Sequence, residues 1–300
     1  MVTVSDELID RIIAEDVPYF DLTSHVLGVA EQQGTMEYFT REACVLAGVE
    51  IVERIARKLG CRVVDHAASG DSLEAGQSFM TMEGSAAALH QAWKACLNVF
   101  DHCSAVATKT RAMTDAAHAV NPACEILTTR KSMPGVKSLL IDAVLAGGAF
   151  PHRLGLSETA LVFDHHLTFM GGFEKFVEQL PAIRPRCAEK KLFVEVDAQR
   201  ALQLARFNAE SMRVCAESDG RVPWAGVDGV QVDKLSVDEL ADLVKQLRAI
   251  DPRLTIVAAG GVNDKNVAAY AGTGVDGLAT TAPYTAKPID MSVRMRMLMR

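Results

Sequence analysis

The chain has 300 residues, with 38 acidic against 31 basic side chains, a formal net charge of −7 and a sequence pI of about 5.6. An acidic chain of this kind is a poor partner for nucleic acid, which is bound by a basic face. No apolar run approaches the length of a membrane span, and the start of the sequence lacks the features of a signal peptide. Its seven cysteines are scattered without a C-x-x-C pair, which is typical of reduced thiols. The composition therefore indicates a cytoplasmic globular protein with neither a nucleic-acid nor a membrane partner.

The first 120 residues mix helices with short strands. Ser5 before two acidic residues predicts a capped helix, and residues 21–24 are predicted to form a turn. Further along we expect a strand at 36–39, a helix at 47–59, strands at 61–65 and 77–83, and a long helix from 86 to about 120. The basic segment 292–300 is more typical of a helix or a frayed end than of a binding arm.

Beyond residue 122, apolar strands alternate with helical stretches. We expect strands at 125–129, 160–163, 192–196, 229–232, 255–258 and 277–279, and helices at 138–146, 199–216, 237–250 and 263–271. Near-continuous apolar strands with helical spacers favour a parallel sheet covered by helices. The sequence thus predicts an α/β fold, with a barrel as first choice and an open doubly wound sheet as the alternative.

Charged and small residues follow these strands where each one ends. Arg130 and Lys131 follow the first strand, and a later turn adds His152 and Arg153. The other strands carry or precede Asp164, His165 and His166; Glu195 and Asp197; Asp233 and Lys234; Gly260 and Gly261; and Thr280 and Thr281. Arginine offers a planar fork for carboxylate or phosphate, and glycines let backbone N–H groups approach a phosphate. Because active sites of barrels gather at the carboxyl ends of the strands, this rim is predicted to bind an anionic substrate, Mg²⁺ and phosphates.

Each pattern also has a plainer explanation. Arg130 and Lys131 could be an ordinary solvated strand end, and two adjacent glycines a common tight turn. Glu195 and Asp233 could cap a strand and a helix. Lys131 could be the Schiff-base lysine of an aldolase-like barrel. A metal site at His165-His166 is less favoured, because adjacent side chains diverge and no third ligand has suitable spacing.

Two motifs, TTRKSMPG at 128–135 and GGAFPHRLGL at 147–156, resemble the type II phosphoribosyltransferases, the quinolinate and nicotinate family. Five further blocks keep the family's order over nearly the whole chain: DLTS at 21–24, FTREACVLAGVE at 39–50, VEVD at 194–197, VAAGGV at 257–262 and TGVDGLATT at 273–281. The resemblance implies an N-terminal α/β sandwich at 1–110, on which segment 285–300 packs. It also implies an incomplete α/β barrel of six or seven strands at 111–284.

In that family, phosphoribosyl is transferred from phosphoribosyl pyrophosphate with Mg²⁺. Lys131, Glu195 and Asp233 match catalytic positions, and the two carboxylates would stabilise positive charge on the ribose ring or hold Mg²⁺ indirectly. The matching substrate-binding positions are Lys94, Arg130, His152, Arg153 and Phe163. The matching phosphate-binding positions are Gly260, Gly261, Thr280 and Thr281. The resemblance also implies a homodimer with a shared active site, which Lys94 and the neighbouring Trp93 would fit, and a hexamer built from dimers is compatible with it.

Several positions depart from the quinolinate pattern. Lys94 replaces an arginine and Phe163 replaces a lysine, while Val257, Ala259 and Thr281 replace residues of the phosphate turns. A pocket that has lost a cation should favour a less charged or more apolar acceptor. The pattern looks like the ModD-type branch, pyrophosphorylase-like proteins associated with molybdenum utilisation. It predicts transfer to an anionic aromatic nitrogen acceptor. The alternatives are a true carboxylating quinolinate phosphoribosyltransferase of NAD biosynthesis and a non-catalytic anion-binding protein.

Overall fold

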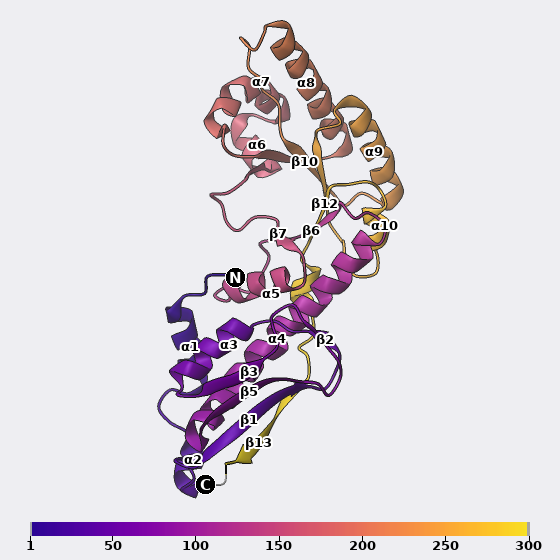
Figure 1. Cartoon of the computed structure of the whole chain (residues 1–300). Coiled ribbons are helices and arrows are strands. Elements are labelled where there is room, and N and C mark those ends of the chain that lie inside the picture. The colour runs from indigo at the N-terminus through magenta and orange to yellow at the C-terminus, as the bar shows by residue number, and fades with distance from the viewer. Residues whose placement is uncertain (1, 299–300) are drawn as a thin grey trace. The chain divides into compact units, whose positions relative to one another are not determined.

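The computed structural model describes residues 2–298, which fall into two compact units, each with its own sheet (Figure 1). The first unit comprises Met1–Ala112, Lys131–Phe150 and Pro283–Arg300, and the second comprises Met113–Arg130 and Pro151–Ala282. No helix in the described part of the chain combines the length and apolarity needed to cross a bilayer.

An antiparallel four-stranded sheet, in the order β13-β1-β5-β3, forms the centre of the first unit. Its strands are β1 (Gln33–Thr40), β3 (Arg62–His66), β5 (Ser78–Ser85) and β13 (Met291–Met297), and β2 (Cys44–Val45) pairs separately with β4 (Ser72–Leu73). The expectation of a helix or a frayed end at 292–300 is wrong for its described part, because 291–297 form the edge strand beside β1. Arginines alternating with apolar residues have the two-residue period of a strand. Residues 299–300 lie outside the described residues.

The helices of the first unit are α1 (Asp6–Asp16), α2 (Leu22–Leu27), α3 (Val49–Lys58), α5 (Lys137–Ala146) and the greater part of α4 (Ala86–His118), and the short η2 (Ala282–Thr285) lies at a unit boundary. The predicted cap of α1 is confirmed, since Ser5 Oγ accepts a hydrogen bond from Leu8 N–H. The predicted turn at 21–24 is wrong: the side chain of Asp21 accepts from Thr23 N–H and so begins α2. In the core, Tyr38, Phe79 and Phe100 pack ring against ring between the sheet and α4.

The second unit contains a seven-stranded sheet in the order β7-β6-β12-β11-β10-β9-β8. Its strands are β6 (Glu125–Thr128), β7 (Phe150–Pro151), β8 (Ala160–Val162), β9 (Leu192–Val196), β10 (Gly229–Asp233), β11 (Thr255–Ala259) and β12 (Gly277–Thr280). In the sheet, each pair of neighbouring strands in the series β6-β12-β11-β10-β9-β8 is parallel. The six predicted strands are thus confirmed, β7 is the seventh, and the sheet curls into the incomplete α/β barrel rather than an open doubly wound sheet.

The helices of this unit are α6 (Asp164–Met170), α7 (Phe173–Ile183), η1 (Arg184–Cys187), α8 (Ala198–Glu217), α9 (Val237–Ile250) and α10 (Val267–Ala271). Helices α8 and α9 lie side by side along the sheet (Figure 1). Beneath the helices, Val230, Ile256 and Leu278 are fully buried, while the opposite face carries half-buried residues such as Glu195. That opposite face is therefore the one available to a substrate.

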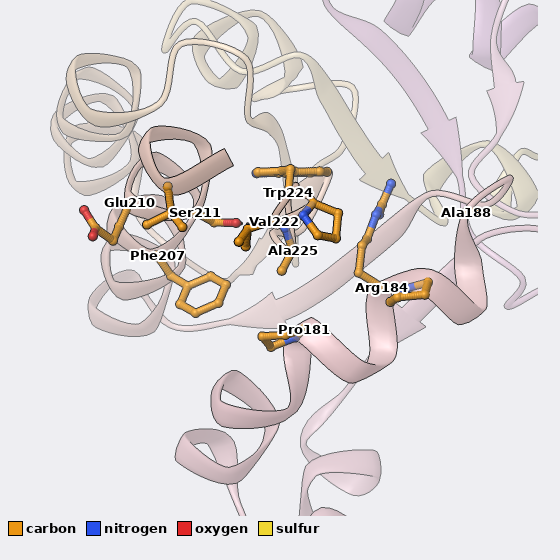
Figure 2. Close-up of a pocket in the computed structure, with 12 residues that line it drawn as sticks. Pro181, Arg184, Ala188, Phe207, Glu210, Ser211, Val222, Trp224 and Ala225 are labelled. Carbon is orange, nitrogen blue, oxygen red and sulfur yellow. Dashed lines mark hydrogen bonds between the residues drawn. The ribbon is translucent and has the colours of Figure 1, made fainter. Parts of the chain in front are cut away.

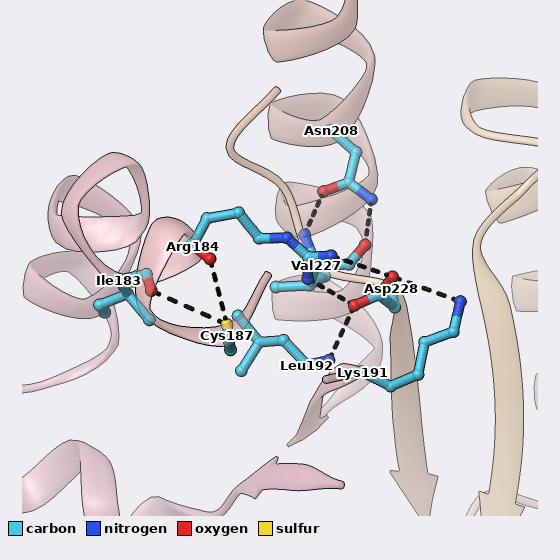
Figure 3. A network of polar contacts seen from close by, with 8 residues as sticks. All are labelled: Ile183, Arg184, Cys187, Lys191, Leu192, Asn208, Val227 and Asp228. Carbon is cyan, nitrogen blue, oxygen red and sulfur yellow. Dashed lines mark hydrogen bonds and ion pairs between the residues drawn. The ribbon is translucent and has the colours of Figure 1, made fainter. Parts of the chain in front are cut away.

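The amino ends of β9 and β10 are tied together by a polar network (Figure 3). The Asp228 carboxylate accepts hydrogen bonds from Leu192 N–H, at 2.8 Å, and from the guanidinium of Arg184. Asn208 of α8 exchanges two 2.9 Å hydrogen bonds with the backbone of Val227. Burial alone would raise the pKa of Asp228, but the bonds from Arg184 and Leu192 outweigh it and lower that pKa. This network holds the amino ends of the strands in place. The predicted site residues lie at the carboxyl ends of the strands.

Candidate active site

The carboxyl ends of the parallel strands lie along one edge of the second unit's sheet. Most predicted site residues of this unit come directly after a strand: Arg130 after β6, His152 and Arg153 after β7, Phe163 after β8, Gly260 and Gly261 after β11, and Thr281 after β12. Three others lie within the last two residues of a strand: Glu195 of β9, Asp233 of β10 and Thr280 of β12. In α/β barrels this edge carries the catalytic groups. The structure therefore brings the predicted site residues of the second unit to one edge of its sheet.

Glu195 and Asp233 lie on neighbouring strands and on the same face. Glu195 pairs with Gln231 across the ladder, and Asp233 is two residues further along β10. Because side chains alternate along a strand, Glu195, Gln231 and Asp233 all face the side opposite the helices. Two carboxylates and an amide on one surface form an acceptor-rich patch that suits a developing cation or a hydrated metal ion.

Asp233 is held by the turn that follows it. Its Oδ2 lies 2.9 Å from Lys234 Nζ, and Lys234 N–H donates to Ala259 O at 2.9 Å. Lys234 has φ +61°, in the left-handed region that costs energy for a residue with a side chain. Gly260 packs so closely that a Cβ there would lie 2.4 Å from Asp233 Oδ1. Only glycine fits at position 260, because any side chain there would collide with Asp233. The left-handed backbone of Lys234 places its side chain beside the Asp233 carboxylate.

Arg153 is the most unusual cation of the rim, because its side chain is only 8% exposed. Its Nε has no hydrogen-bond partner among the described residues, and its Nη1 makes one long bond, 3.5 Å, to Thr159 O. Burial, and then the charge of Arg130, lowers the pKa of Arg153. Burial and the charge of Arg153 likewise lower the pKa of His152, which favours its neutral imidazole, while Glu158 opposes the shift at both residues. A buried guanidinium next to a second cation is a position at which a bound anion would be stabilised.

The ring of Phe163 stands next to this guanidinium. Arg153 Cζ lies 5.8 Å from the Phe163 ring centroid, within cation–π range. His166 also stacks on this ring, with the ring centroids 5.9 Å apart, and its Nδ1 accepts a hydrogen bond from Phe163 N–H at 2.9 Å. The Nδ1 atom of His166 is thus occupied by the hydrogen bond at the start of α6. Within the described residues no group of three or more His, Cys, Asp or Glu side chains has metal-binding geometry.

The predicted phosphate turns are ordered by their own hydrogen bonds. The Thr280 hydroxyl is buried, donating to Val262 O and accepting from Ala282 N–H. Thr281 Oγ1 lies 2.8 Å from Thr129 Oγ1, which ties β12 to β6. Helix α10 begins at Val267 rather than at the predicted 263, because the amides of Asn263 and Asn266 bond to Gly261 O and form a turn. Any phosphate contact here would come from loop backbone and Thr281 rather than from a helix terminus.

Two predicted residues belong to the first unit. Lys94 is exposed on α4, with its ammonium 5.5 Å from the Trp93 ring centroid. Lys131 follows Arg130 directly and starts the segment that leads to α5. The functional roles of all these residues remain predictions.

A pocket of about 710 Å³ is lined by segments that precede β9 and β10 (Figure 2). Its walls are mostly apolar and include Pro181, Phe207, Val222 and Trp224. The charged and hydroxyl groups around it are already engaged: Arg184 with Asp228, Glu210 with Arg213, and Ser211 with Ala225 N–H. Because these groups bond to other parts of the protein, the pocket offers a mainly apolar surface.

One residue of the rim, Gln231, was not predicted from the sequence. It is a polar residue within the apolar strand GVQVD, and it donates a hydrogen bond to Glu195. An amide that interrupts an apolar strand is the signal that could have identified it.

The curled parallel sheet and the charged residues at its strand ends are typical of α/β-barrel enzymes, in which the carboxyl ends of the strands carry the reacting groups. Residues 21–104 match the N-terminal domain, and residues 106–294 the C-terminal domain, of quinolinate phosphoribosyl transferase. A relative from Pasteurella multocida, named as the pyrophosphorylase ModD, is 34% identical over 98% of each chain. The nicotinate-nucleotide pyrophosphorylase [carboxylating] of Mycobacterium leprae is 32% identical over 92% of this chain and 91% of its own.

Among solved structures, NadC from Streptococcus pyogenes superposes with a TM-score of 0.84 at 22% identity, covering 99% of this chain and 100% of its own. At that identity the likeness shows the fold alone. Because the family matches extend over most of the sequence, the chain belongs to the quinolinate phosphoribosyl transferase family, as its motifs predicted. It is accordingly a pentosyltransferase that uses phosphoribosyl pyrophosphate.

Proposed function

We propose that the protein is a ModD-type phosphoribosyltransferase. It transfers phosphoribosyl from phosphoribosyl pyrophosphate to an anionic aromatic nitrogen acceptor and releases pyrophosphate. The similarity to relatives named ModD supports this branch, and the association with molybdenum utilisation rests on the same resemblance. Seven cysteines that are all free support an enzyme that works in the reducing cytoplasm.

The observation that carries the proposal is the buried Arg153 with its unpaired Nε. The charge of Glu158 offsets only part of the cost of burying this cation, so the site is built for an anion that arrives with the substrate. Arg130 adds a second positive charge, while Phe163 offers a ring face beside the guanidinium. An acceptor with one carboxylate and an aromatic ring fits both features.

The chemistry follows from the carboxylates of β9 and β10. When pyrophosphate leaves, the C–O bond at the anomeric carbon breaks before the new C–N bond is complete, so positive charge grows on the ribose ring. Glu195 and Asp233 face this charge and stabilise it. Lys131 contacts the departing pyrophosphate, and the turns at Gly260-Gly261 and Thr281 bind phosphate oxygens.

Mg²⁺ fits the residues present. It binds through one or two carboxylates, waters and substrate phosphates rather than through a full protein cage, and Glu195 and Asp233 supply two carboxylates on one face. When bound, it would neutralise pyrophosphate charge. The protein's own part is to hold the two carboxylates side by side.

Calorimetry with phosphoribosyl pyrophosphate and Mg²⁺, followed by an acceptor screen that detects pyrophosphate release, tests the proposal. Binding of the co-substrate together with turnover on an aromatic monocarboxylate would support it. Absence of pyrophosphate release with every acceptor would contradict it.

Quinolinate is expected to be a poor acceptor for the wild-type enzyme. Phe163 and Lys94 stand where the quinolinate pattern has lysine and arginine, and each lost charge-assisted contact costs about 1.5–3 kcal/mol. Phe163→Lys should therefore raise kcat/KM for quinolinate by about 10- to 150-fold. Phe163→Leu is the matched control, since it removes the ring without adding charge, and it should give no gain. Efficient carboxylating turnover of quinolinate by the wild type would contradict the expectation.

The second candidate function is that of a true quinolinate phosphoribosyltransferase. The 32% identity to the carboxylating pyrophosphorylase of Mycobacterium leprae favours it. The quinolinate assay above separates it from the first, because only this candidate predicts efficient wild-type turnover.

We further propose a homodimer in which Lys94 completes the partner's site. Lys94 and Trp93 form an exposed cation and aromatic pair on α4, as an interface would require. Mixing Lys94→Ala subunits with Glu195→Gln subunits should recover up to about half of the wild-type sites, because each mixed dimer regenerates one intact site. Each parent alone should keep only a small residual activity. A monomer in sedimentation, or no recovery after verified subunit exchange, would rule out the shared site.

A further inference from the structure

Strand β10 carries an amide in the middle of the barrel sheet. Gln231 pairs with Glu195 of β9 on one side and with Val257 of β11 on the other. Its side chain is only 6% exposed. The flanking Val230 and Val232 face the helices, so Gln231 faces the same side as Glu195 and Asp233.

Only one of the two polar atoms of the Gln231 amide forms a hydrogen bond. Gln231 Nε2 donates to Glu195 Oε2, whereas Gln231 Oε1 is buried and has no hydrogen-bond partner within residues 2–298. The orientation of the amide is fixed by chemistry, because a carboxylate only accepts and must meet the NH₂ group. The oxygen that lacks a protein partner is therefore Oε1, which points away from Glu195.

A buried carbonyl without a partner costs stability, and a methionine of similar length would fill the space without that cost. Stability thus gives no reason for a glutamine here, while the contact with Glu195 does. A hydrogen bond from a buried, immobile side chain holds a carboxylate in one orientation, as supporting residues of catalytic groups do.

We propose that Gln231 is a positioning residue of the transfer reaction: its amide holds the Glu195 carboxylate toward the ribose ring. This inference rests on the proposed function, in which Glu195 opposes the charge of the transition state. Misplacement of such a group lowers kcat more than it weakens substrate binding.

The test compares Gln231→Met in the wild-type and the Glu195→Gln backgrounds. In the wild type we expect kcat to fall by about 10- to 100-fold, the KM for phosphoribosyl pyrophosphate to stay within about threefold, and the melting temperature to equal or exceed that of the wild type. In the Glu195→Gln background, Gln231→Met should change kcat by less than about threefold, since residues that act as a unit are non-additive. Val230→Ala is the matched control on the same strand: it opens a cavity under the helices, so it should lower the melting temperature and leave kcat nearly unchanged.

An unchanged kcat, an equal loss in both backgrounds, or a loss of kcat that accompanies a lower melting temperature would each overturn the proposal. Crystal structures of the wild type and Gln231→Met give a readout that does not need activity. The Glu195 carboxylate should be turned or split between two rotamers in the variant, and an unmoved carboxylate would also overturn the proposal. If the wild type transfers phosphoribosyl to no acceptor, the proposed function fails by itself, and the position of Glu195 still decides whether Gln231 orients it.

Discussion

Replacing Glu195 by glutamine, or Asp233 by asparagine, is expected to lower kcat by about 10²- to 10³-fold. Both carboxylates face the side of the sheet opposite the helices, and the charge that they oppose exists mainly in the transition state. The KM for phosphoribosyl pyrophosphate should therefore change by less than about threefold. Steady-state kinetics of pyrophosphate release measure both quantities.

Asp197→Asn is the matched control for these two variants. Asp197 follows the same strand as Glu195, but its carboxylate caps α8 by accepting from Arg200 N–H at 2.9 Å. Asparagine caps a helix equally well, so this variant should keep wild-type kcat. Normal turnover of both Glu195→Gln and Asp233→Asn would show that the catalytic assignment is wrong.

Replacing Arg153 by methionine is expected to raise the KM for the acceptor by about 30-fold or more, because truncating one partner of a buried charge pair costs about 2–5 kcal/mol. The variant should also be at least as stable as the wild type. In the free enzyme the cost of burying the guanidinium outweighs its attraction to Glu158, and exchanging a buried charge for an apolar side chain is often neutral or stabilising. Acceptor titrations and thermal unfolding measure the two effects.

Two controls accompany this variant. Arg153→Lys keeps the charge and loses the planar fork, so its acceptor KM should lie between those of the wild type and Arg153→Met. Arg186→Met removes an exposed arginine of η1 and should leave the KM unchanged. An unchanged acceptor KM in Arg153→Met would show that the acceptor carboxylate binds elsewhere.

The parts of the fold that the sequence predicted well are those in which local pattern and burial agree. Strand β9 and helix α9 have the predicted bounds, because an apolar run and a capped amphipathic helix each contain their own signals. Strand β13 and helix α2 were missed. An edge strand exists because a distant partner offers its hydrogen bonds, and α2 depends on a single aspartate cap.

The candidate site shows the same division. Strand-end residues such as Glu195 and Asp233 could be placed from the sequence, because parallel strands bring their carboxyl ends to one edge. The burial of Arg153 and the left-handed backbone of Lys234 could not, since both arise from packing between segments far apart in the chain. The unpaired carbonyl of Gln231 likewise appears only once the neighbouring strands are in register.

The pairing of β13 with β1 has a consequence for the order in which the protein is made. On the ribosome β1 emerges early, and its hydrogen-bonding edge stays open until residues 291–297 have been synthesised. An unpaired strand edge invites pairing with other chains, and contacts between distant segments form slowly. The first unit is thus the last to be completed although its sequence comes first, and nascent chains that stall before β13 are the ones that would depend on chaperones.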